Sequence, residues 1–169
     1  TYAGSGGTQA FIFADDIGDG RLYCDRTFLP VDTSGLTNLA TITAATLNMP
    51  NPQNYGTFNW ATVLEGTQAS TSTLSTSDFN KFGTTAWLTN YTGGTGTFNA
   101  AGRAGINKTG FTKYCIRNAF FDVEALDVTG SDRNEITVST SEGSYPPYLS
   151  VTYTVSSTGR KKPPIINIY

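Results

Sequence analysis

The chain consists of short runs in which apolar and polar residues alternate, and this alternation limits it to an all-β fold. Every second residue of Tyr148–Val155 is apolar, and the second half of Ala40–Met49 has the same pattern. Alternation with a period of two gives a strand with one buried and one solvated face. Gly, Asn, Asp and Pro, which favour turns, separate the runs. The predicted strands are residues 9–14, 21–29, 40–49, 57–65, 84–89, 95–99, 112–118, 135–141, 148–155 and 165–169.

About ten short strands in one 169-residue chain predict a two-sheet antiparallel β-sandwich of the jelly-roll kind. We expect residues 1–155 to form this domain and residues 156–169 to form a linker and a tail. Two stretches, 76–82 and 99–106, predict single helical turns, because each begins with capping residues or is rich in Ala. An aromatic content of 12% is too high for a disordered chain, so a packed core is expected.

The composition excludes several classes of function. The chain has no His, which removes Ser-His-Asp and Cys-His catalysis and every zinc site that uses His. Its net charge is −2, and residues 160–162 are its one basic stretch, so no nucleic-acid surface is expected. No apolar run approaches the roughly 18 residues of a membrane helix. We therefore expect a non-enzymatic protein without a membrane span.

The C-terminal tail indicates assembly with other copies of the chain. A flexible spacer and the basic stretch lead into two prolines, which favour an extended approach, and then into a short β-prone apolar segment. Such a segment is expected to add a strand to a sheet of its own chain or of a neighbour. The function predicted is a structural subunit of an extracellular or virion assembly: a filament, tubule or surface layer. The predicted assembly residues are Pro163, Pro164, Ile165, Ile166, Ile168 and Tyr169.

A family resemblance supports this interpretation. The segment RTFLPVDTSGL at 26–36, followed by ATITAATL at 40–47, resembles the opening of DNRLRE-type β-sandwich domains. Residues 106–117 and 145–153 resemble the late and final strands of the same family. The resemblance implies a jelly-roll domain on secreted, cell-surface or virion proteins, usually a structural spacer, an adhesive module or a carbohydrate binder. The chain departs from the family where the usual Phe-Asp turn reads Val31-Asp32.

An acidic, glycine-containing stretch near the N-terminus is a candidate calcium site. Carboxylates interleaved with Gly at 15–20 suit Ca²⁺, which takes six to eight oxygen ligands. The same residue types are also typical of a surface turn between strands, so that alternative stays open. Calcium is the one cofactor expected. The candidate ligands are Asp15, Asp16, Asp19 and Asp25.

The alternative function is a carbohydrate-binding or adhesion module with polysaccharide as partner. Trp87, Tyr91 and Tyr55 are the candidates for stacking on sugar rings, although packing in the core or between subunits would use the same side chains. Trp60 alternates with other apolar residues of the predicted strand 57–65, so it is expected in the core. Sugar binding by the domain without its tail would favour this alternative.

The two cysteines, Cys24 and Cys115, have two possible states. They form a disulfide if their strands are neighbours, which a secreted setting favours, or they remain buried free thiols. A secretory signal removed before Thr1 would agree with the expected extracellular, cell-surface or virion-surface location.

Overall fold

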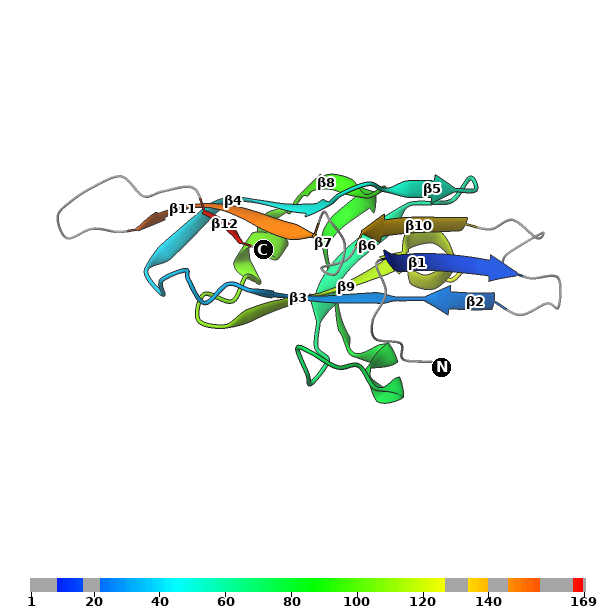
Figure 1. Cartoon of the computed structure of the whole chain (residues 1–169), viewed down its shortest axis with the longest axis horizontal. Helices are drawn as coiled ribbons and strands as arrows, with labels where there is room; N and C mark the ends of the chain where they lie inside the picture. Colours follow the sequence, from blue (N-terminus) through cyan, green and yellow to red (C-terminus); the bar gives the residue numbers. More distant parts are fainter. Residues whose placement is uncertain (1–8, 17–21, 127–133, 140–145, 156–165, 169) are drawn as a thin grey trace.

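The computed structural model describes residues 9–16, 22–126, 134–139, 146–155 and 166–168, and these form an antiparallel β-sandwich (Figure 1). Twelve strands make three four-stranded sheets in this part of the chain. Sheet A has the order β2 (Leu22–Asp25), β1 (Gln9–Asp16), β10 (Asn134–Ser139), β5 (Gln53–Tyr55). Sheet B has the order β3 (Thr27–Asp32), β9 (Phe111–Asn118), β6 (Ala61–Gly66), β7 (Phe82–Tyr91). Sheet C has the order β12 (Ile166–Ile168), β11 (Tyr148–Val155), β4 (Ala40–Met49), β8 (Gly94–Thr97).

Within the described residues, three short helical segments connect the strands. The two predicted helical turns are confirmed as η1 (Thr76–Asn80) and α1 (Ala100–Ala104). The third, a π-helical turn η2 (Ala119–Val123), directly follows β9 and was not predicted. The side chain of Asn118 caps η2 by accepting hydrogen bonds from the first free N–H groups of the turn.

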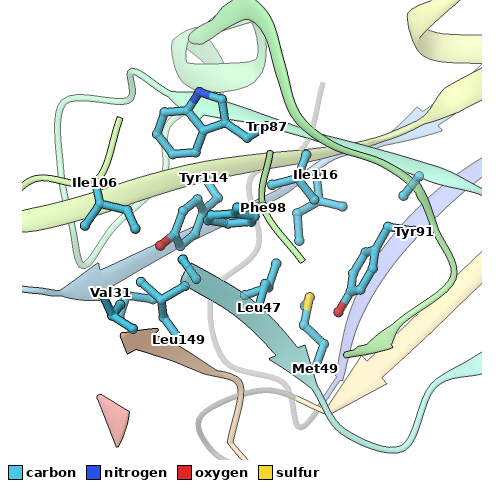
Figure 2. Packing of buried hydrophobic residues seen from close by; sticks show 14 of the residues in the cluster. Val31, Leu47, Met49, Trp87, Tyr91, Phe98, Ile106, Tyr114, Ile116 and Leu149 are labelled. Carbon is cyan, nitrogen blue, oxygen red and sulfur yellow. The ribbon is translucent and has the colours of Figure 1, made fainter. Parts of the chain in front are cut away.

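Side chains from all three sheets meet in one hydrophobic core (Figure 2). Trp87, Phe98 and Tyr114 pack edge to face, with ring centroids 5.4 to 6.0 Å apart, in the arrangement that aromatic pairs prefer. Sheet C contributes the two apolar faces that the alternation predicted, and they are confirmed as buried. Their buried residues are Ala45, Leu47 and Met49 of β4 and Leu149, Val151 and Tyr153 of β11.

The all-β sandwich is therefore confirmed, with differences in detail. The predicted strand 21–29 is interrupted at Arg26, so that β2 belongs to sheet A and β3 to sheet B, and three sheets replace the predicted two. The jelly-roll connectivity stays a prediction. The predicted strand 57–65 begins only at Ala61, and Trp60 is half-buried beside an exposed Phe58. The prediction that Trp60 is a core residue was wrong.

Candidate functional site

The tail forms a strand, β12, at the edge of sheet C. It pairs antiparallel with β11 of the same chain, and β12 lies beside β11 in Figure 1. The sequence left open whether the tail docks on its own sheet or on a neighbour; in the single chain it docks on its own. Ile165, Tyr169 and the two prolines lie outside the described residues. The register is Leu149 with Ile168, Ser150 with Asn167, and Val151 with Ile166.

The strand that receives β12 is held firmly from its other side. β11 pairs with β4 along its whole length, with one irregularity between Thr152 and Tyr153. Leu149 and Val151, which stand opposite β12, are fully buried in the core. The pairing with β4 and this burial both hold β11 in position. The β11 edge is therefore a fixed template for an added strand.

The register also limits the length of the ladder. Three residue pairs are formed, and continuing the same register would set Pro164 against Tyr153 and Pro163 against Thr154. Proline has no backbone N–H and cannot donate to a ladder. The sequence of the tail therefore restricts its contact to the first half of β11, whichever chain provides the β11 edge.

A buried ion cluster joins sheet B to η2. Both carboxylate oxygens of Asp122 accept hydrogen bonds from Arg26 and Arg117, and Nε lies 2.7 Å from Oδ2 in the first pair and 2.9 Å in the second. The side chains are only 5%, 10% and 12% exposed for Asp122, Arg26 and Arg117. Burial alone would raise the pKa of Asp122, but the two guanidinium groups outweigh it and hold that pKa below its usual value.

The same cluster fastens the loop between β6 and β7. Nη1 of Arg26 donates to the carbonyl of Phe79 and to Oδ1 of Asn80, both at 2.8 Å. The guanidinium of Arg26 also lies 3.9 Å from the centre of the Phe79 ring, and that of Arg117 lies 4.1 Å from the Phe82 ring. These contacts bind the loop and η2 to one side of sheet B. The cluster has the geometry of a structural clamp.

Of the predicted calcium ligands, only Asp25 has a described side chain. Asp15 and Asp16 lie in β1, whose backbone alone is described, and Asp19 lies outside the described residues. The pKa of Asp25 is raised, first by its partial removal from water and then by the nearby carboxylate of Glu135. Within the described part of the chain, no three His, Cys, Asp or Glu side chains gather as metal ligands. The calcium site stays a prediction.

Both cysteines are free thiols in the structure, Cys115 buried and Cys24 half-buried, which agrees with the free-thiol alternative. Cys115 stands opposite Phe28 in sheet B, and Cys24 lies four positions before Phe28. The two cysteines lie in different sheets, Cys24 in β2 of sheet A and Cys115 in β9 of sheet B. Burial raises the pKa of Cys24 to about 11 and that of Cys115 to about 12.

Two of the three predicted sugar-stacking residues lie in the core. Trp87 is 5% exposed and packs against Phe98, while Tyr91 is 2% exposed and donates its hydroxyl to the carbonyl of Gly94. Neither ring has a face that a sugar can reach, so of the two alternatives that the sequence left open for them, packing in the core is the one observed. Tyr55, in contrast, is exposed in β5.

A different group of rings, which the sequence did not indicate, lies partly at the surface. Phe58, Trp60 and Phe120 form an aromatic cluster in which both Phe58 and Trp60 pack on Phe120, with centroids 5.0 and 5.1 Å away. The Phe58 ring is 40% exposed. Its backbone is fixed by buried side chains: Asn134 accepts from its N–H at 2.8 Å and Asn118 donates to its carbonyl at 3.0 Å. The cluster is thus an exposed aromatic surface on a rigid support.

Comparison with known proteins gave no match: no family profile, no curated protein and no solved structure is similar to the chain. The DNRLRE-type resemblance therefore stays an expectation from the sequence. Among the described helices, none is long and apolar enough to cross a membrane.

Proposed function

We propose that this protein is a non-catalytic structural subunit of an extracellular or virion assembly, in which β12 of one copy pairs with β11 of the next. The observation that supports this most is the placement of the tail as a strand on a fixed sheet edge, in a defined register. Residues 156–165 separate the two strands, and ten residues can extend roughly 33 Å. That length is sufficient for β12 of one copy to reach β11 of a neighbouring copy that is in contact with it.

The proposed contact would combine a generic and a specific part. Backbone hydrogen bonds would attach the strand, while the apolar Ile166 and Ile168 would hold the register opposite the buried Val151 and Leu149. A donor strand at one end of the chain and an acceptor edge on the sandwich make a head-to-tail contact. Repetition of a head-to-tail contact gives a ring or an open filament.

The best-defined charged group also supports a non-catalytic role. A general acid requires a raised pKa, as in glycosidases, whereas the pKa of Asp122 is lowered by Arg26 and Arg117. Both carboxylate oxygens of Asp122 are already bound. The carboxylate is thus suited to hold structure together and unsuited to donate a proton.

The proposal is tested by electron microscopy and sedimentation of three chains at the same high concentration: the full chain, a chain that ends at Thr158, and the double variant I166D/I168D. Assemblies are expected from the full chain alone, because charged residues opposite buried apolar ones cannot keep the register. The variant N167S, which changes the middle residue of β12 without adding charge, is the control. The proposal would be overturned if the chain that ends at Thr158 assembled to the same extent as the full chain while all four proteins had the same melting temperature.

A second candidate function, carbohydrate binding, rests on the aromatic cluster. A rigidly supported, exposed ring suits stacking on the apolar face of a sugar, and Phe58 meets that description. Glycan-array binding by the chain that ends at Thr158, lost in F58A and kept in F111A, would establish it. Phe111 is similarly exposed but lies in β9, away from the cluster, so it is a matched control.

A further inference from the structure

We infer that β12 is a self-capping strand: on its own chain it occupies the edge that a neighbour must use, and copies join only by displacing it. This inference rests on the proposed function and adds its regulation. The supporting observation is that the single chain already fills the proposed acceptor edge with the proposed donor strand. The donor and the acceptor therefore compete within every copy.

The strength of the strand contact does not decide this competition, because the contact is the same within one chain and between two chains. An intramolecular and an intermolecular β12 would form the same three pairs with β11, so the contributions of these pairs cancel in the comparison. Both ladders end at the same prolines, so neither contact can lengthen at the expense of the other. What remains is the entropy of the connection, which favours the strand on the same chain.

The size of that preference follows from the connecting segment. In the observed register β12 returns from Val155 to stand opposite Val151, a span of roughly 14 Å along the sheet. A ten-residue segment covers this span without strain, and short flexible connections give effective concentrations of the order of millimolar. At micromolar concentration the chain is thus expected to cap itself, and crowding into a local millimolar layer is expected to start the exchange.

The test is a variant in which residues 158–164 are deleted. Three residues then connect Val155 to Ile166, and their four virtual bonds reach about 14 Å only when fully extended, leaving no length for the turn. Self-capping becomes geometrically impossible, whereas pairing with a neighbour does not. At about 10 µM the variant is expected to sediment as dimers or larger species, while the full chain remains monomeric. A control with seven Gly and Ser residues in place of 158–164 should remain monomeric as well.

Hydrogen exchange gives a second measurement that does not depend on the deletion. In the monomeric full chain, amides within Leu149–Val151 should exchange at least tenfold more slowly than in the chain that ends at Thr158. Equal exchange would overturn the inference, as would a full chain that assembles at nanomolar concentration or a deletion variant that is folded and monomeric. Each of these results would overturn the inference about self-capping and leave the proposed function intact. The proposed function fails by a different result, namely that the truncated chain assembles as well as the full chain.

Discussion

The ion cluster provides the sharpest prediction about stability. In D122N the amide cannot neutralise Arg26 and Arg117, which are about 90% buried and are brought together by this one carboxylate. Removing one partner of a buried ion pair costs about 3–5 kcal/mol, because a charge is left without compensation. For a domain of this size that loss lowers the melting temperature by roughly 10 °C.

The assay is urea unfolding followed by tryptophan fluorescence, with E124Q as the matched control. Glu124 lies just after η2 and is exposed, and E124Q removes the same charge as D122N. E124Q should therefore change the free energy of unfolding by less than about 0.5 kcal/mol. If D122N and E124Q unfold at the same urea concentration, the cluster does not stabilise the fold and the reasoning is refuted.

The pH dependence gives the same test a second readout. The pKa of Asp122 is lower in the folded chain than in the unfolded chain, where it is about 3.9. Its contribution is therefore complete above that value and is lost as the pH falls through the folded-state pKa. The difference in unfolding free energy between the original chain and D122N should be constant from pH 5 to pH 7 and should shrink below about pH 4.

Three further predictions concern single sites. G105A should destabilise the fold by about 1–3 kcal/mol, since a Cβ there would lie 2.2 Å from the Trp87 ring, whereas G35A, with open space around it, should be neutral in the same melt. N118A should cost about 2–3 kcal/mol in urea unfolding, because it frees the cap of η2 and the carbonyl of Phe58 together, whereas N54A at an exposed position should not. At pH 8 an aromatic disulfide reagent should leave both thiols of the folded chain unmodified and label two per chain in urea, since burial raises both pKa values well above 8; fast labelling of the native chain would contradict that.

Alternation was sufficient to predict the strands whose pairing is regular over most of their length. The bounds of β4 and β11 agree with the sequence prediction, because one face of each strand is buried over most of its length. The short strand β5 was missed, since Gln53 and Asn54 carry no apolar signal and the strand exists only through its pairing with β10. Strand formation at that point is decided by tertiary context.

Irregular pairing explains why alternation did not decide whether Trp87 and Tyr91 lie in the core. The register between β6 and β7 shifts several times, and each shift breaks the period of two from which burial is predicted. Trp87, between Ala86 and Leu88, and Tyr91, which follows Asn90, are both buried in β7. Trp60 was placed in the core because the strand was expected to begin at residue 57. The strand begins later, since buried Asn side chains bind the backbone N–H and carbonyl of Phe58.

The ion cluster shows a different limit of sequence reasoning. Arg26 and Asp122 are 96 residues apart, and neither lies in a motif that marks it as half of a pair. In the sequence Asp122 stands near Glu124 and Asp127, a pattern that is typical of a solvated acidic loop. The structure buries it, because η2 turns the chain back over sheet B and brings the carboxylate between two arginines.

The central claim, pairing of β12 with β11 of another copy, is tested most directly by disulfide trapping at one register position. Ser150 and Asn167 stand opposite each other, at a separation that a disulfide can bridge. Chains that carry S150C but not N167C are mixed at high concentration with longer, tagged chains that carry N167C but not S150C, and are then oxidised. The account predicts a disulfide that joins the two different chains, while the double variant S150C/N167C at low concentration closes within one chain. Closure of the double variant without any bond between the mixed chains would contradict the claim.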